Sequence, residues 1–193
     1  MSLNGVLRLA CSFLLVAGVV SVSTTIASAD EPKTTKVTIK GLELEVPAAW
    51  SSQPPANSMR LAQFLVPGAT PEASAELVIS SFGGAVDANL NRWAAQFAAD
   101  GREVKVTRGK VPQGEYYLSD ITGTFNQPVG PPMAGKTKAV PGTRSLSVML
   151  LTPEKGTFFL KLTGPDATVK AAADDLRKTF GASAKDETPY TPQ

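Results

Sequence analysis

The stretch from Arg144 to Phe180 constrains the fold more than any other part of this chain of 193 residues. Polar and apolar side chains alternate over 145–150 and again over 157–163, and the segment between them, 152–156, contains a proline and a glycine. A period of two on both sides of such a turn is typical of a β-hairpin that buries one face. The chain is therefore built around a sheet, and other elements have to cover its apolar face.

A helix is predicted directly after this hairpin. Gly164-Pro165 is a typical helix start and Gly181 a typical helix end, so the helix is expected over 165–180. Its apolar residues recur at helical spacing and predict one buried stripe: Val169, Ala172, Ala173, Leu176 and Phe180.

The N-terminal half contains a similar set of elements. Alternation on both sides of Gly41 predicts a hairpin over 37–46, with lysines and glutamates on its wet face. Two further strands are predicted at 62–66 and 76–82. The period then changes, and a second helix is expected over 87–99.

The second helix is predicted from an apolar face that contains Trp93, which we expect in the core rather than at a ligand site. Asp87 is a plausible N-cap, and Gly101 a plausible end. The opposite face is expected to contact water; it carries Asn89, Asn91, Arg92 and Gln96.

Two more strands are predicted at 103–106 and 115–125. Leu118 and Ile121 differ in parity, which indicates a β-bulge near Ser119-Asp120. Asp120 is interpreted as structural, either a partnered carboxylate or the polar side of the bulge, because an unpartnered buried charge is costly.

Residues 126–143 are predicted to be an irregular loop, because they are rich in Pro and Gly. Long loops inside a domain are often functional, and methionine adapts to irregular partners. Met133, Lys136 and Lys138 are therefore the candidate binding residues. The alternative is a solvated crossover between two strands.

One motif in this loop is rejected. Residues 130–137 match the spacing of a phosphate-binding loop, but Pro131 and Pro132 have no backbone N–H to offer a phosphate. Pro141 also comes too soon for the helix that such a loop requires.

Residues 1–29 are predicted to be a secretory signal peptide. Arg8 is their only charge, residues 9–22 are almost wholly apolar, and Ala27-Ser28-Ala29 is a small-x-small cleavage site. Cleavage after Ala29 would give a periplasmic or secreted protein. The alternative is a leader that stays in place as a membrane anchor.

Absent residue types exclude several function classes. The sequence has no histidine, and Cys11, its single cysteine, lies in the leader, so the mature domain is expected to be free of cysteine. Ser-His-Asp and Cys-His catalysis and zinc or haem sites that need His or Cys are thereby excluded. The chain has 19 Lys+Arg against 17 Asp+Glu, so no nucleic-acid partner is expected.

Three short motifs resemble the PsbP-like superfamily: VPAAW at 46–50, SDITGTF at 119–125 and GTFFLKLTGPDATV at 156–169. That superfamily includes the extrinsic protein of the oxygen-evolving complex, a nuclear Ran-binding factor and many small secreted bacterial proteins. The resemblance covers 37–180 and implies a PsbP-like α/β sandwich with a role in binding or assembly. The resemblance to the photosynthetic members suggests manganese or calcium binding, but the sequence shows no matching cluster of metal ligands.

The expected fold is α+β: a single twisted, mostly antiparallel β-sheet with two helices packed on it, over 36–181. A polar lead-in at 30–35 precedes it, and a disordered tail at 182–193 follows.

The expected function is a non-catalytic binding or assembly domain for a protein or small ligand of the cell envelope, with no catalytic residue, metal ligand or cofactor. Two alternatives stay open: an enzyme that uses carboxylate or Ser/Lys chemistry, and a purely structural envelope component. Contact with the membrane is expected only if the leader is retained.

Overall fold

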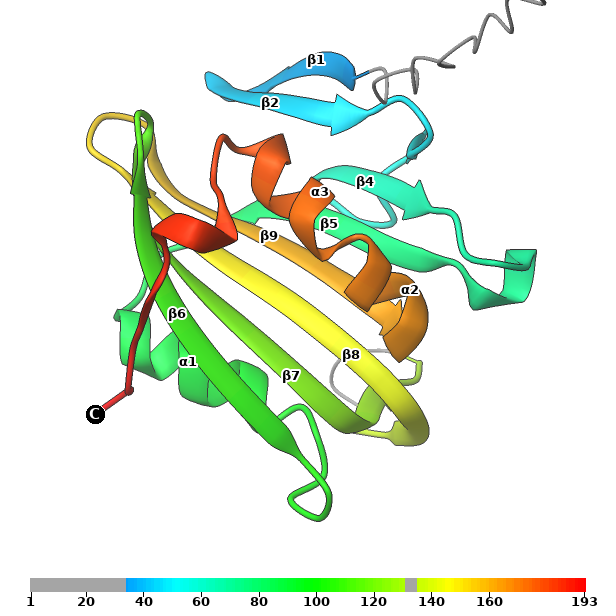
Figure 1. Cartoon of the computed structure of the whole chain (residues 1–193). Coiled ribbons are helices and arrows are strands. Elements are labelled where there is room, and N and C mark those ends of the chain that lie inside the picture. The colour runs from blue at the N-terminus through cyan, green and yellow to red at the C-terminus, as the bar shows by residue number, and fades with distance from the viewer. Residues whose placement is uncertain (1–33, 131–134) are drawn as a thin grey trace, which may run out of the picture. The chain divides into compact units, whose positions relative to one another are not determined.

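An eight-stranded antiparallel sheet lies at the centre of the structure, a computed structural model that describes residues 34–130 and 135–193. The strand order is β10-β6-β7-β8-β9-β5-β4-β3 (Figure 1). The strands are β3 (Ser51–Gln53), β4 (Arg60–Val66), β5 (Ala75–Ser81), β6 (Glu103–Val111), β7 (Gly114–Pro128), β8 (Thr137–Thr152), β9 (Gly156–Pro165) and β10 (Thr188–Pro189). The predicted leader, 1–29, lies outside the described residues.

The hairpin predicted in the C-terminal half is confirmed as β8–β9. Its register pairs Leu146 with Leu162 and Val148 with Leu160, and all four side chains are buried. The α+β class and the mostly antiparallel sheet are also confirmed.

Helices cover both faces of the sheet (Figure 1). On one face lie α2 (Asp166–Ala171) and α3 (Ala173–Thr179), which divide the predicted helix 165–180 at Ala172. On the other face lies α1 (Val86–Ala94), which packs Leu90 and Trp93 on the sheet. In the described part of the chain, no helix is both long and apolar enough to cross a membrane.

The first hairpin forms a small two-stranded sheet of its own, whereas the prediction placed it in a single sheet. It consists of β1 (Thr34–Ile39) and β2 (Leu42–Pro47), and the backbone of Lys40 and Gly41 has positive φ in the turn. The buried side chains of β2 extend the core on the α3 side of the main sheet: Leu42, Leu44 and Val46.

α1 is shorter than predicted, because its last residues turn back to the sheet. Phe97 forms a β-bridge with Phe125, and the N–H of Ala98 donates to the carbonyl of Thr124. The N-cap prediction for Asp87 is wrong: Ala85 is the N-cap, and Asp87 instead accepts a hydrogen bond from the hydroxyl of Tyr190.

The predicted bulge at Ser119-Asp120 is wrong. The register of β7 is regular there, and it shifts only between Gly123 and Phe125. Leu118 and Ile121 have opposite parity because each faces a different apolar core, one under α2 and α3 and one under α1.

Asp120 has the structural role predicted for a partnered carboxylate. Its two carboxylate oxygens accept from Nε and Nη2 of Arg144, both at 2.7 Å, and Nη1 of Arg144 donates to Asp166 at 2.9 Å. The two-pronged pair with Asp120 is geometrically specific and joins β7 to β8, and the bond to Asp166 joins both strands to the start of α2.

Most of the predicted loop 126–143 is strand, so that prediction is wrong. The ladder between β7 and β8 continues to the pair Pro128 and Thr137, and the N–H of Val129 donates to the carbonyl of Lys136. The described residues here, 126–130 and 135–143, therefore belong to the far part of a long hairpin rather than to an unpaired crossover.

The predicted disorder of 182–193 is also wrong. Residues Ala184–Asp186 form a 3-10 turn, and β10 pairs with β6 at the edge of the main sheet. Glu187, between them, accepts hydrogen bonds from Arg177 at 2.7 and 3.0 Å and from Thr107 at 2.8 Å. The tail is therefore attached through a nearly buried ion pair.

Candidate ligand-binding groove

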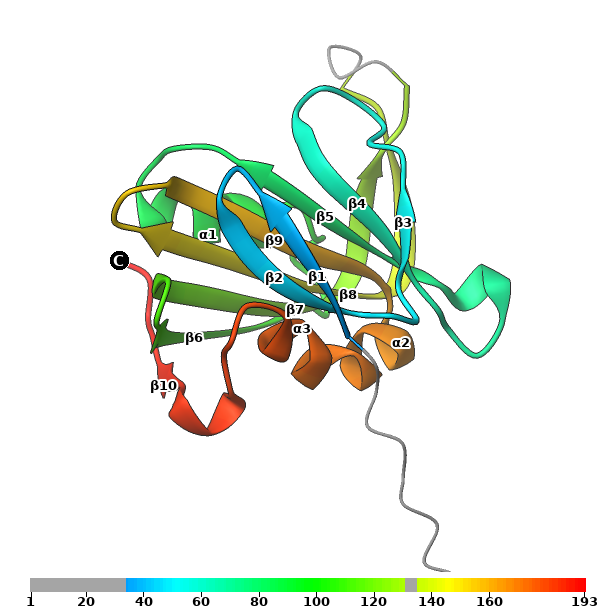
Figure 2. The ribbon, with the colours of Figure 1, turned by 90° about the horizontal axis from the view of Figure 1, so that it is seen from above.

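A groove of about 860 Å³ opens on the α1 side of the sheet. Its walls come from β4, β5, β9 and α1 and from the far ends of β7 and β8. Figure 2 shows β4 and β5 beside β9, with the end of the β7–β8 hairpin on the same side of the molecule. We call this cavity the groove.

Apolar side chains are exposed in the groove. Phe82 and Leu65, which both line it, are 45% and 43% exposed. The ring of Phe82 stacks on Phe159 at 6.0 Å, and Phe159 meets the edge of Trp93 at 5.5 Å. The groove therefore has an aromatic wall that is continuous with the core below α1.

Lys161 lies on the floor of the groove. On β9 it pairs with Val78 of β5 on one side and Ser147 of β8 on the other, so its Cα is in the middle of the sheet. Its half-buried side chain donates a hydrogen bond to Oε1 of Gln96, and its Nζ lies 5.3 Å from the centroid of the Phe125 ring. Burial lowers the pKa of Lys161 to about 8, and the positive charge of Arg92 acts in the same direction.

No carboxylate compensates this charge within the residues that the structure describes. Neither Lys161 nor Arg92 takes part in a salt bridge there. Arg92 donates to the neutral Oδ1 of Asn89 at 2.6 Å. Glu76, a lining residue, accepts from Arg60 at 3.0 Å and from Gln63 at 2.7 Å. The groove thus contains two cations with neutral partners.

The groove offers apolar contacts together with the cationic side chains of Lys161 and Arg92. Lys161 is its only side chain with a strongly shifted pKa among the described residues. In the same part of the chain, no three His, Cys, Asp or Glu side chains come together to hold a metal ion.

The three predicted binding residues do not line the groove in the part of the chain that the structure describes. Met133 lies outside the described residues, and Lys136 and Lys138 are exposed near the end of the β7–β8 hairpin. Lys138 pairs with Gln127 of β7 and lies on the same face of β8 as Val140. Gln127 and Val140 both line the groove. The hairpin that carries Lys136 and Lys138 is therefore continuous with the groove, although Lys138 does not line it.

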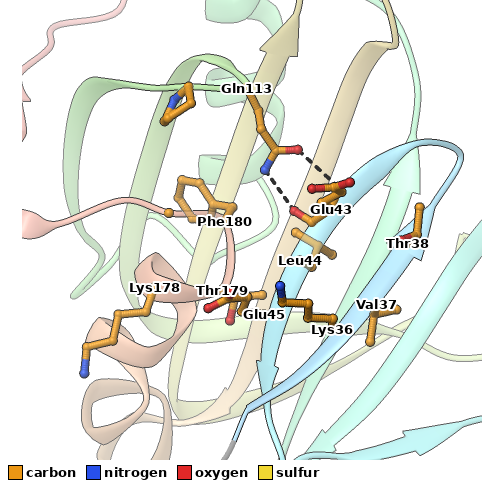
Figure 3. A pocket seen from close by; sticks show the side chains of 12 residues that line it. Lys36, Val37, Thr38, Glu43, Leu44, Glu45, Gln113, Lys178, Thr179 and Phe180 are labelled. Carbon is orange, nitrogen blue, oxygen red and sulfur yellow. Dashed lines mark hydrogen bonds between the residues drawn. The ribbon is translucent and has the colours of Figure 1, made fainter.

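A second cavity, of about 450 Å³, lies between β1–β2, the β6–β7 turn and α3. Figure 3 shows two hydrogen bonds between the side-chain amide of Gln113 and the backbone of Glu43. The N–H of Glu43 donates to Oε1 of Gln113 at 3.1 Å, and Nε2 of Gln113 donates to the carbonyl of Glu43 at 2.8 Å. Its exposed charges are of both signs: Lys36, Glu43, Glu45 and Lys178. Because these charges balance, the cavity has no preference for a charged ligand. We interpret it as a contact region that holds the β1–β2 hairpin in place.

Sequence reasoning missed Lys161, Arg92 and Gln96 as site residues. The alternation around Lys161 places it on the face opposite to the main apolar set, where a lysine is normally solvated. The available signal was the amphipathic helix near Trp93, which needs a sheet face to cover. A lysine on that covered face is unusual.

No family model and no curated protein matches the sequence. Among solved structures, the chain is similar to the solution structure of cyanobacterial PsbP (CyanoP) from Synechocystis sp. PCC 6803. The identity is 13%, the match covers 86% of this chain and 98% of that chain, and the TM-score is 0.46. No site residue or role is taken from this likeness, and the resemblance to the PsbP-like superfamily stays a prediction from the sequence motifs.

Proposed function

We propose that this chain is an exported, non-catalytic binding domain that holds a small, largely apolar ligand in the groove. The observation that carries the proposal is the exposure of Phe82 and Leu65 within one concavity of about 860 Å³. Sites for small molecules are concave, mostly apolar and about 300–1,000 Å³ in volume.

The balance of apolar and polar lining supports a small ligand. Phe82, Val78 and Val140 offer apolar contact, whereas Gln127 and Thr163 add polar groups at separate points of the wall. A few polar groups in an apolar cavity orient a ligand without dominating its affinity.

Export is the second half of the proposal and rests on the leader alone. We expect the exported protein to begin at Asp30, after cleavage behind Ala29. Intact-mass measurement of the protein from the envelope or medium tests this. A mass that includes residues 1–29 would instead indicate a retained anchor.

Binding in the groove is tested with Nile red, a neutral dye whose fluorescence rises in apolar sites. Val78→Ser combined with Phe82→Ser should weaken dye binding at least tenfold, because two apolar contacts are lost. Val104→Ser is the matched control, since Val104 is 46% exposed on β6 and outside the groove. Equal dye binding by wild type and the double variant would refute the groove as the site.

A second candidate is a protein partner that contacts Met133, Lys136 and Lys138. The shared face of Lys138 and Val140 on β8 favours it, since a partner at the hairpin could reach the mouth of the groove. Alanine at all three positions should then reduce capture of an envelope partner. Unchanged capture would exclude these residues.

A further inference from the structure

We infer that the ligand of the groove is an amphiphile with one anionic group, and that Lys161 binds this group with help from Arg92. The inference rests on the proposed function, because it names the chemical class of the molecule that the groove holds.

The position of Lys161 is the first support. A lysine in the middle of a sheet usually extends its ammonium to bulk water. Here the ammonium lies beside the Phe125 ring and donates to Gln96, within the walls of the groove. An apolar molecule in the groove would cover this ammonium further, which is unfavourable unless the molecule supplies a negative charge.

The charges around the groove are the second support. Its lining carries three cations and two carboxylates: Arg60, Arg92, Lys161, Glu72 and Glu76. Glu76 is paired with Arg60 on the β4–β5 side. Glu72 is fully exposed, and its carboxylate is held by its own backbone N–H and by Thr70. Two cations therefore remain for a ligand, one on β9 and one on α1.

The effect of an anion at this place follows from simple electrostatics. Burial and Arg92 both disfavour the ammonium form of Lys161, whereas an anion between the two cations favours it. Binding of an anion should therefore raise the pKa of Lys161. By linkage, affinity should fall as the pH rises above about 8, where the free protein loses the proton.

The test compares ligands that share one chain and differ in the head group. Dodecanoate, dodecyl phosphate, dodecanol and dodecyltrimethylammonium are titrated below their micellar concentrations against bound Nile red. We expect at least one anion to bind about tenfold or more tightly than dodecanol, the gain of a charge-assisted hydrogen bond. The two anionic arms separate carboxylate from phosphate recognition.

Variants assign the preference to Lys161. Lys161→Met should remove most of the preference for the anion, and dodecanol should bind at least as tightly as it does to wild type, because it no longer covers an ammonium. Lys170→Met is the control, because it removes one exposed positive charge from α2, on the other face of the sheet. Lys161→Arg should retain the preference and keep it at pH 10, since a guanidinium stays charged there.

The outcomes separate the two proposals. Equal affinity for anions and dodecanol, with displacement of dye from the groove, would overturn the inference and leave the proposed function standing. Failure of all four amphiphiles, with no dye bound in the groove, would overturn both. A wild-type anion affinity that stays flat from pH 7 to pH 10 would also contradict the role of Lys161.

Discussion

Lys161 costs the folded protein free energy when the groove is empty. Burial and Arg92 lower its pKa to about 8 from an ordinary value of 10.5. The folded state therefore binds this proton less readily than the unfolded chain does. At neutral pH both states are protonated and the cost is present in full. It declines as the pH rises from about 8 toward 10.5.

Removing this charge should stabilise the protein. We expect Lys161→Met to raise the free energy of unfolding by about 1–3 kcal/mol at pH 7, with the difference shrinking between pH 8 and 10.5. Urea denaturation at several pH values measures it. A variant less stable than wild type at pH 7 would show that the ammonium is well satisfied in the free protein.

Glu187, in contrast to Lys161, stabilises the folded protein. Burial alone would raise its pKa, but hydrogen bonds from Arg177 and Thr107 outweigh burial and lower it below the ordinary value of 4.5. The pair of Glu187 and Arg177 is nearly buried, with side chains 5% and 12% exposed. Its contribution is therefore present above pH 4.5 and is lost as the pH falls through the lowered pKa.

Replacement of Glu187 should consequently be costly. Glu187→Gln is expected to lower the free energy of unfolding by about 2–4 kcal/mol at pH 7, because it leaves Arg177 without its partner. Asp186→Asn, an exposed neighbour, should change it by less than about 0.5 kcal/mol. Urea denaturation of both variants provides the measurement, and equal stabilities would show that the tail is not attached through this pair.

At the scale of elements, the alternation of polar and apolar residues predicted the strands well. It did not predict which of their faces are buried or which distant segments they contact. The β8–β9 pairs around Leu146 and Val148 follow directly from a period of two. The parity of Leu118 and Ile121 was misread as a bulge because the prediction assumed one buried face, and α1 buries the second. The ordered structure of the tail depends on contacts of Glu187 with Arg177 and with Thr107, which lies 80 residues away in the sequence, so the polar composition of the tail was misleading.

The junction of β9 and α2 shows why a short motif can be specific to a fold. A Cβ atom on Gly164 would lie 2.6 Å from the Cβ and 2.7 Å from the Cα of Ala75, so β5 approaches β9 too closely for any side chain there. The presence of Gly164 in the motif at 156–169 is thus explained by packing.

Gly164→Ala should destabilise the fold by about 1–3 kcal/mol, because the backbone of β5 has to move. Gly83→Ala is the control, since its Cβ would meet no atom within 4 Å. Thermal unfolding of the two variants compares them directly. If Gly164→Ala unfolds at the temperature of wild type, the close approach of β5 and β9 is not a constraint.

At the scale of the whole molecule, the site arises where distant segments meet. Arg92 from α1, Gln96 just after that helix, Lys161 from β9 and Phe125 from β7 come together only in the folded protein. Each of them alone has an ordinary place in its own element, so sequence patterns could not identify the groove. The predicted site at Met133, Lys136 and Lys138 was instead based on local composition, and it remains a prediction.

The most direct measurement of the central claim is a titration of the ¹⁵N-labelled protein with dodecanoate, followed by amide chemical shifts. We predict saturable shifts at Val78, Phe82, Gln96 and Lys161, with none at Lys36 or Gln113 in the second cavity. The same shifts should be weaker in Lys161→Met and unchanged in Lys170→Met. Shifts confined to the second cavity, or no shifts at all, would contradict a ligand-binding groove with Lys161 on its floor.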